Sequence, residues 1–186
     1  EGDLNNDGRL DVIISDDGAD RFRVNTGNDA FGRVVWTSAQ QFQFASGSDD
    51  GFASNNLIVD LNNDGWDDVI ICDVDVDIGG YSRRTHIYHN RTTSSTQTTL
   101  SLREEKQQSG SGGWHGVVGM MKSDLTGTHD IAAFDLDSDG DNDMLVSRQA
   151  GTFVWMNDAA PPVACGISKY DVGASAANTL DLTGTG

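Results

Sequence analysis

The chain has 186 residues, enough for one domain with a substantial core, and its 29 acidic and 12 basic residues give a net charge of −17. This balance argues against nucleic acid and anionic membrane surfaces as partners, because both are bound through basic patches. The sequence contains no run of 18 apolar residues for a membrane-spanning helix, and its 22 glycines and 2 prolines are typical of a turn-rich β protein.

The first unit of the sequence opens with the stretch 3–11, of the form D-x-N-x-D-G-x-x-D, and the branched apolar run 12–14 follows it. Oxygen-bearing side chains at alternate positions, with a glycine for the sharp turn, are how a short loop surrounds a hard cation. The expected ligands are Asp3, Asn5, Asp7, Arg9 (through its carbonyl) and Asp11. Strands are predicted over 12–14, over 22–25 and over 34–36.

The second unit repeats this order. A strand is predicted over 56–59, the loop follows at 60–68, and strands are predicted over 69–71 and 86–90. A further strand is predicted over 116–120. The expected ligands of this loop are Asp60, Asn62, Asp64, Trp66 (through its carbonyl) and Asp68.

An insertion separates the second loop from the third. The segment 91–99 is rich in Ser and Thr, 107–113 has the composition of a flexible loop, and 97–108 is interpreted as a strand that leads into a loop. Such segments act either as a binding surface or as a tolerated insertion, and the sequence leaves both open. The triplet Asn90-Arg91-Thr92 fits an N-glycosylation acceptor at Asn90.

The third unit has predicted strands over 131–134, 144–146 and 153–157, with a loop at 135–143. The expected ligands of this loop are Asp135, Asp137, Asp139, Asp141 (through its carbonyl) and Asp143. Residues 1–157 are thus predicted to form the repeat region. Residues 158–164 are predicted to be a linker, and 165–186 to begin either a further repeat or a different small β module.

The expected ligands are all oxygen atoms, which favours Ca²⁺ over Zn²⁺, while Mg²⁺ requires a tighter octahedron and keeps several waters. An EF-hand would need a bidentate Glu at the twelfth position and flanking helices. The twelfth positions are instead Ile14, Ile71 and Val146, which lie in predicted strands. We therefore expect three Ca²⁺ sites in strand-flanked loops, each closed by the aspartate at the ninth position.

The loops begin at Asp3, Asp60 and Asp135, 57 and 75 residues apart, which suits a unit of about four strands, as in a propeller blade. The loops, the strands after them and the asparagines that end later strands resemble FG-GAP/VCBS repeats, the calcium-loop blades of integrin-α-like β-propellers. The resemblance covers about residues 1–157. The three asparagines are Asn25, Asn90 and Asn157.

The resemblance implies an all-β fold of β-propeller-type blades, here about three four-stranded repeats in an incomplete ring. It implies mainly structural calcium and an extracellular or cell-surface setting, with roles in cell adhesion or in binding a glycan or an extracellular protein. A self-associating structural subunit of a surface layer, stalk or filament is the alternative. A non-catalytic accessory part of a secreted enzyme is a third reading, because no catalytic set is expected in this segment.

Two of the four tryptophans are candidates for stacking on sugar rings. Trp66 lies inside the second loop, and Trp114 lies beside the stretch with flexible-loop composition. Trp36 and Trp155 lie in strand patterns and suit the core.

The remaining acidic and imidazole side chains give weaker signals. Asp73, Asp75 and Asp77 alternate along a predicted strand, so they form either an extra cation site or a solvated edge. His86 and His89 face opposite sides of a strand and make a poor metal pair. The two cysteines, at 72 and 165, are compatible with a disulfide or with two buried thiols.

Overall fold

The fold was obtained as a computed structural model of the chain, which describes residues 1–16, 18–43, 53–73, 85–104, 127–148, 151–157 and 167–171. In these ranges the regular secondary structure consists of 13 strands, which form four antiparallel sheets. Within the same ranges, no helix has the length and apolarity needed to cross a membrane. The all-β class predicted from the sequence is confirmed.

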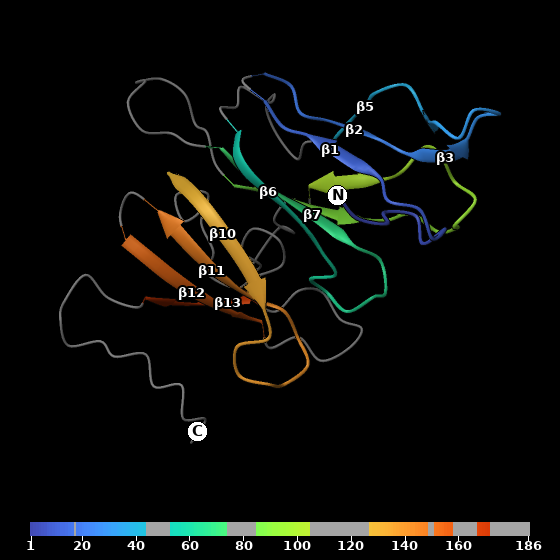
Figure 1. Ribbon diagram of the computed structural model, residues 1–186. Helices are drawn as coiled ribbons and strands as arrows, with labels where there is room; N and C mark the ends of the chain where they lie inside the picture. The colour runs from blue at the N-terminus through green and yellow to red at the C-terminus, as the bar shows by residue number, and fades with distance from the viewer. Residues whose placement is uncertain are drawn as a thin grey trace.

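The second repeat forms a four-stranded sheet in which consecutive strands are neighbours (Figure 1). Its strands are β6 (Ala53–Val59), β7 (Asp68–Asp73), β8 (His86–Asn90) and β9 (Leu102–Glu104). The register places Ile70 of β7 opposite Leu57 and opposite Ile87. The strand predicted over 116–120 lies outside the described residues. The fourth position is filled by β9, which comes from the stretch 97–108 that was predicted to lead from a strand into a loop.

The third repeat builds a sheet with the same strand order. Its strands are β10 (Thr128–Phe134), β11 (Asp143–Arg148), β12 (Gly151–Asn157) and β13 (Ile167–Asp171). Here β13 pairs with β12, from Phe153 opposite Asp171 to Asn157 opposite Ile167. Residues 167–171 therefore complete the third sheet, where the sequence predicted the start of a further repeat or of a different module. The sequence of β13 lacks the alternating apolar residues that would have indicated this pairing.

The first repeat is divided between two small sheets. One contains β1 (Val12–Ile14), β2 (Arg21–Arg23) and β5 (Gln40–Gln41), and the other pairs β3 (Asn25–Asn28) with β4 (Val34–Trp36). The strand predicted over 22–25 is therefore divided, because β2 ends at Arg23 and Asn25 already belongs to β3. The strand predicted over 34–36 is confirmed, but it lies in the smaller sheet.

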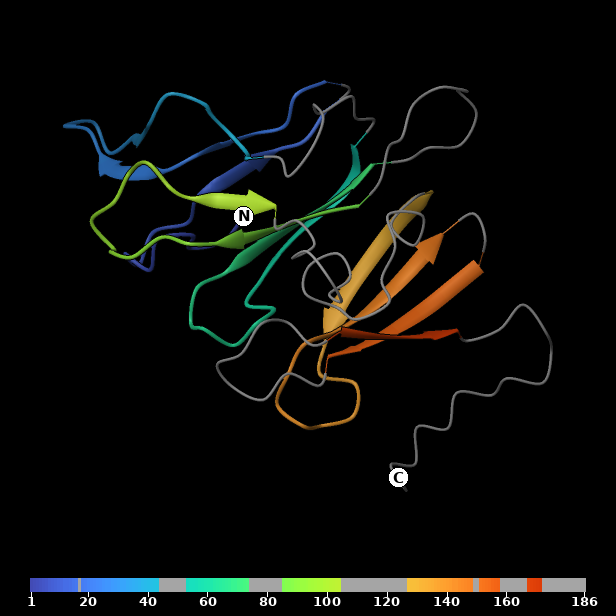
Figure 2. The same cartoon turned by 180° about the vertical axis from the view of Figure 1, so that it is seen from behind.

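The core lies on both faces of the central strand β7, because successive side chains of a strand point to opposite sides. Ile70 and Cys72 pack against the third sheet, in a cluster that includes Trp155. Val69 and Ile71 pack against the first repeat, in a second cluster. The second sheet is consequently enclosed between the first repeat and the third sheet, as Figures 1 and 2 show.

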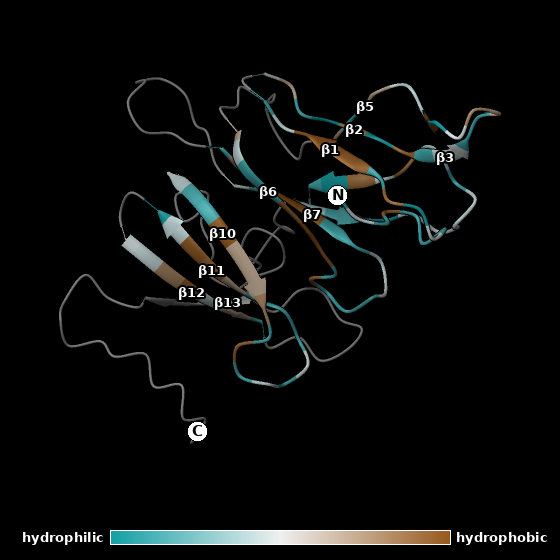
Figure 3. Cartoon of the chain, viewed as in Figure 1, coloured by the Kyte–Doolittle hydropathy of each residue, from teal (hydrophilic) through white to brown (hydrophobic). Residues whose placement is uncertain are grey.

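The hydropathy of the strands and loops follows this arrangement. Figure 3 shows apolar colouring along β7 and β11, inside the stack, and mostly hydrophilic colouring on the loops that join β6 to β7 and β10 to β11. Every residue of β7 is buried, including both terminal aspartates. A strand buried on two faces fixes its register strongly, and it thereby fixes the loop at 60–68 that leads into it.

Candidate functional site

In each of the three loops, the carboxylate of the first aspartate accepts hydrogen bonds from two backbone N–H groups of the same loop. In the first loop, the Asp3 carboxylate accepts from Asp7 N at 3.0 Å and from Gly8 N at 2.7 Å. Asp60 and Asp135 make the corresponding pairs of bonds to the fifth and sixth residues of their loops. The first side chain therefore fixes the turn that carries the other candidate ligands.

The fourth and sixth residues of each loop have left-handed backbone conformations. At the fourth position φ is 54°, 55° and 67°, in Asn6, Asn63 and Ser138. At the sixth position φ is 85°, 84° and 97°, in Gly8, Gly65 and Gly140. A Cβ added to these glycines would meet nothing within 4 Å, so the backbone conformation, and not space, is what favours glycine there.

The ninth aspartate of each loop connects the loop, through hydrogen bonds, to a residue at a strand further along the chain. One oxygen of Asp11 accepts from Leu4 N at 3.0 Å, and the other accepts from Asn25 N at 2.8 Å. The same two bonds recur for the carboxylates of Asp68 and Asp143. All three aspartates are buried, and each oxygen retains a lone pair for a ligand. Sequence reasoning assigned this residue to the cation alone, although the asparagines that recur at strand ends were a signal of its second partner.

Side-chain amides connect the first two loops to the repeats that follow them. Asn90, which ends β8, donates from Nδ2 to the carbonyl of Leu4 in the first loop at 2.7 Å. Asn157, which ends β12, donates in the same way to the carbonyl of Leu61 in the second loop at 2.6 Å. The loops therefore lie in a row along one edge of the stacked sheets (Figure 1).

The loops also contact one another directly. Nδ2 of Asn6 donates to the Gly65 carbonyl at 2.7 Å, and Nδ2 of Asn63 donates to the Gly140 carbonyl at 3.4 Å and to the Asp141 carboxylate. In return, Nδ2 of Asn142 donates to the Asp60 carbonyl at 3.0 Å. The conformation of one loop is thus coupled to that of its neighbour.

These contacts bear on the glycosylation expected at Asn90. Its side chain is buried, and the same Nδ2 that donates to Leu4 also donates to the Asp67 carbonyl at 2.9 Å. A glycan on that nitrogen would displace both hydrogen bonds from the interior, so the folded chain has no place for it. The triplet pattern missed this because it carries no information on burial.

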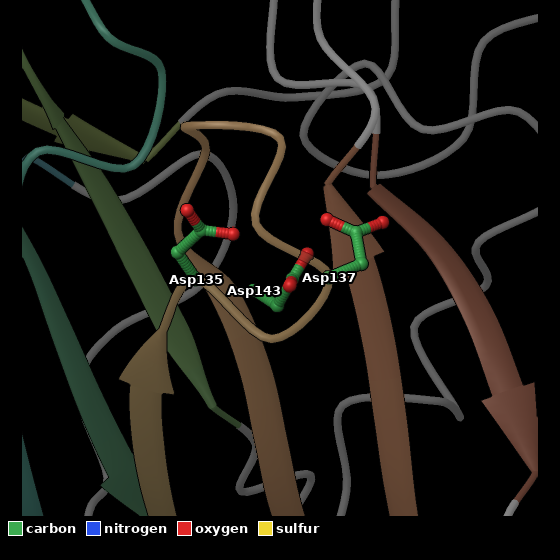
Figure 4. Close-up of side chains that lie close together, drawn as sticks. All are labelled: Asp135, Asp137 and Asp143. Carbon is green, nitrogen blue, oxygen red and sulfur yellow. The ribbon is translucent and has the colours of Figure 1, made fainter. Parts of the chain in front are cut away.

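The third loop gathers its carboxylates most closely. Asp135, Asp137 and Asp143 offer oxygen atoms that all lie within 4.8 Å of one another, and Figure 4 shows the three side chains in the loop. The first two are exposed and the last is buried. Although Asp137 is exposed, partial desolvation within the loop raises its pKa, and the charges of Asp139 and Asp143 raise it further. Such mutual repulsion is what a bound cation would relieve.

Carboxyl groups of the other loops have raised pKa values for the same reasons. Burial raises the pKa of Asp60, and the charges of Asp68 and Asp64 add to the effect, while the Gly65 hydrogen bond opposes it. Burial is also the main cause of the raised pKa of Asp11. In the first two loops, therefore, negative charge is concentrated where solvation is poor.

The first loop differs in its surroundings. Asn5 is completely buried, and its Oδ1 accepts no hydrogen bond from the described part of the chain. Arg9 pairs with the Asp7 carboxylate and donates from Nε to the Asn25 carbonyl at 2.9 Å. In the second loop, Arg91 lies 3.8 Å from the Asp64 carboxylate.

The side chains present fit a hard divalent cation. The donors at the first, third, fifth and ninth positions are carboxylate and amide oxygens, and the unpartnered Asn5 oxygen is an acceptor that a cation would satisfy. The carbonyl ligands on Arg9, Trp66 and Asp141 stay a prediction.

The aromatic candidates have different outcomes. Trp66 is half-buried at the second loop, so part of its ring is accessible, and Trp114 lies outside the described residues. Trp155 is buried in the core, as its strand pattern predicted. The same prediction for Trp36 is wrong, because Trp36 is only half-buried, on the mostly exposed strand β4.

Asp73 does not lie on a solvated edge, because it is buried against His86. Nε2 of His86 lies 3.3 Å from Asp73 Oδ2, and Nδ1 lies 3.2 Å from Glu104 Oε1. The two carboxylates are therefore on opposite sides of one imidazole ring. Sequence reasoning missed this cluster because its members come from three strands. Asp75 and Asp77 lie outside the described residues.

Cys72 is a free, buried thiol, and burial raises its pKa to about 12. Cys165, its candidate disulfide partner, lies outside the described residues.

Comparison with known proteins points to one family. A search of curated proteins found no match to this chain. A family model described as an FG-GAP-like repeat matches residues 3–71, which span the first two loops and the strands that follow them. Residues 3–71 therefore carry the pattern of an FG-GAP-like repeat.

Proposed function

We propose that this chain is a calcium-stabilised repeat segment of β-propeller type, in which Ca²⁺ holds neighbouring sheets together. The observation that carries the proposal is the recurrence of one loop conformation, with three to five carboxylates in each copy, at the edge where the repeats meet. Three such loops in contact would repel one another at neutral pH without a counter-charge.

The ligands would come from the same positions in each loop. Side-chain oxygens are available at the first, third, fifth and ninth positions, and the carbonyl of the seventh residue would complete each set. Ca²⁺ takes six to eight oxygen ligands at about 2.3–2.6 Å, so solvent would supply the remainder. In the first loop the ion would also satisfy Oδ1 of Asn5, which is otherwise a buried acceptor without a donor among the described residues.

Bound calcium would act through the contacts between loops. Asn6 and Asn63 donate to carbonyls of the following loop, and Asn90 and Asn157 donate back to the preceding one. A cation that orders one loop would therefore order the acceptors on which its neighbour depends. The role of the ion is structural, and this chain's own residues supply the adhesion between repeats.

Calorimetric titration and thermal unfolding of the full chain test the proposal. We expect up to three Ca²⁺ ions to bind, with dissociation constants of about 10⁻⁴ to 10⁻³ M, and a chelator to lower the melting temperature markedly. The variant Asp29→Asn is a matched control, because it removes a carboxylate that is paired with Arg33 outside the loops. Unfolding that is unaffected by a chelator would refute the proposal.

The setting that best suits calcium sites of this affinity is extracellular or at the cell surface, with a glycan or an extracellular protein as partner. The half-buried Trp66 supports a glycan contact beside the second loop. A glycan-array screen in calcium, with Trp66→Ala as the comparison, tests this role. Loss of a signal in the variant would support it, and no signal with the native chain would contradict it.

A structural subunit is the second candidate, because the first repeat exposes large apolar side chains. They are Leu10, Ile14, Phe31, Val34 and Val35, and Phe31 is 82% exposed. Exposed apolar side chains mark an interaction surface where they form one contiguous patch. Ordered polymers seen by light scattering in calcium, without glycan binding, would favour this candidate over the binding module.

A further inference from the structure

The first loop is covered by a turn that belongs to the second repeat. Residues 93–97 lie between β8 and β9, in the segment whose sequence suggested either a binding surface or a tolerated insertion. Nδ2 of Asn5 donates toward the Gln97 carbonyl at 2.9 Å and the Ser95 carbonyl at 3.3 Å, and within the loop it lies 2.9 Å from the Asp7 carboxylate. The corresponding amide of the second loop, in Asn62, has no acceptor within hydrogen-bond distance among the described residues.

The turn is itself held in place by a side chain. Oε1 of Gln97 accepts from Thr93 N at 2.8 Å and from Ser94 N at 3.0 Å, and Gln97 N donates to the Ser94 carbonyl at 3.0 Å. From the first repeat, Gln40 donates to the Thr98 carbonyl at 2.7 Å. The carbonyls that face Asn5 are therefore fixed in position.

The contact decides which way the Asn5 amide points. Carbonyl oxygens only accept hydrogen bonds, so the atom that faces Ser95 and Gln97 must be the nitrogen. Oδ1 is then turned away from both carbonyls, and it is buried without a donor. In the second loop, by contrast, Oδ1 of Asn62 accepts from Asp64 N at 3.0 Å.

We propose that the turn 93–97 is a positioning element for the first cation site, because its two carbonyls orient Asn5 so that Oδ1 is presented to Ca²⁺. This inference rests on the proposed calcium function. It makes asparagine necessary at position 5, whereas the equivalent residue of the third loop is Asp137. A carboxylate at position 5 would place an oxygen against these two carbonyl oxygens and the Asp7 carboxylate, and it would lose all three hydrogen bonds.

The matched substitutions Asn5→Asp and Asn62→Asp test the proposal. Charge alone predicts that both tighten calcium binding, because each adds a carboxylate to its loop. We expect Asn62→Asp to tighten its own site several-fold and Asn5→Asp to weaken the first site about tenfold, since buried acceptors then face one another. Binding is followed in the full chain by nuclear magnetic resonance through the amides of Gly8 and Gly65, which report on the first and second loops separately.

A second pair of variants acts on the turn without touching the loop. Gln97→Ala removes the acceptor that holds the turn and should weaken the first site while leaving the Gly65 response unchanged. Gln97→Glu keeps the acceptor and should restore binding. Thr99→Ala is the control, because Thr99 is exposed, lies outside the turn, and its side chain makes no hydrogen bond to the described residues. This pair decides the question if Asn5→Asp does not fold.

The outcomes separate the two proposals. If the native chain binds no Ca²⁺, the proposed function fails. If it binds Ca²⁺ but Asn5→Asp tightens the first site as Asn62→Asp tightens the second, or if Gln97→Ala leaves the Gly8 response unchanged, only the positioning role is overturned.

Discussion

The first and third loops have the same backbone conformation but very different surroundings. The first is covered by the turn 93–97, its third residue is a buried amide, and Arg9 pairs with one of its carboxylates. The third has an aspartate at all five alternate positions, and its first two candidate ligands are exposed. No ion pair of the described residues reaches the third loop.

The comparison shows that one turn can be stabilised in two ways. In the first loop the protein supplies a guanidinium and hydrogen bonds from a neighbouring repeat, so part of the turn is held without an ion. In the third loop the repulsion between carboxylates is unrelieved, so order there depends more on a bound cation. We therefore expect dependence on calcium to increase from the first repeat to the third.

The largest expected effect comes from Asp143→Ala. The substitution removes the acceptor for two N–H groups, those of Leu136 at 2.7 Å and Asn157 at 2.8 Å, and should cost about 3 kcal/mol of unfolding free energy. Asp11→Ala removes the same two bonds in the first loop, so the two variants should match in a chelator. In calcium, Asp143→Ala should lose more unfolding free energy than Asp11→Ala. Equal losses in both conditions would contradict the graded dependence on the ion.

Removal of calcium should affect the two loops unequally. Hydrogen exchange at the Gly140 amide, which donates to Asp135, should accelerate more than exchange at the Gly8 amide, which donates to Asp3. Exchange measured by nuclear magnetic resonance with and without a chelator resolves both amides. A larger acceleration at Gly8 than at Gly140 would contradict the expected increase in calcium dependence from the first loop to the third.

The pH dependence of stability should depend on calcium. The pKa values of Asp60, Asp137 and Asp141 are raised by desolvation within the loops and by neighbouring carboxylates. Above pH 3.8 the folded chain therefore retains protons that the unfolded chain has lost. Stability in a chelator should therefore fall as the pH rises from 3.8 through the raised pKa values. Denaturant titrations at pH 5 and pH 7 check this fall, and saturating Ca²⁺ should abolish it. Higher stability at pH 7 than at pH 5 in the chelator would contradict this prediction.

The smallest expected effect is that of Arg9→Gln. The substitution removes the positive charge beside Asp7, so the first loop should come to resemble the third in its need for an ion. Because the arginine is 40% exposed, the loss of unfolding free energy in a chelator should be about 0.5 kcal/mol. Calcium should recover this loss. If the variant is at least as stable as the native chain in the chelator, the Arg9–Asp7 pair contributes nothing to stability.

The loops were predictable because their determinants are local. The alternating oxygens and the glycine specify a turn within nine residues, and the branched apolar run after each loop specifies the strand that carries it. The burial of Trp155 followed from its strand pattern. Each of these features depends on neighbours in the sequence, which the sequence displays directly.

The connections between repeats were not predictable, because their partners are distant in the chain. The bond from Asn90 to the Leu4 carbonyl spans 86 residues, and it depends on the register of β8 in the stacked sheets. The polar turn 93–97 gave no sign of its contact with Asn5 for the same reason. His86 could be assigned to a strand face, but not to the carboxylates of Asp73 and Glu104.

The central position of β7 limits how this chain can be divided. Its side chains contribute to one apolar cluster with the first repeat and to another with the third sheet. If the second repeat were removed from the chain, both apolar clusters would lose part of their residues. Both faces of the excised sheet would then be exposed to water. The second repeat is therefore not a transferable module, and boundaries for truncation or domain grafting should keep both of its neighbours attached.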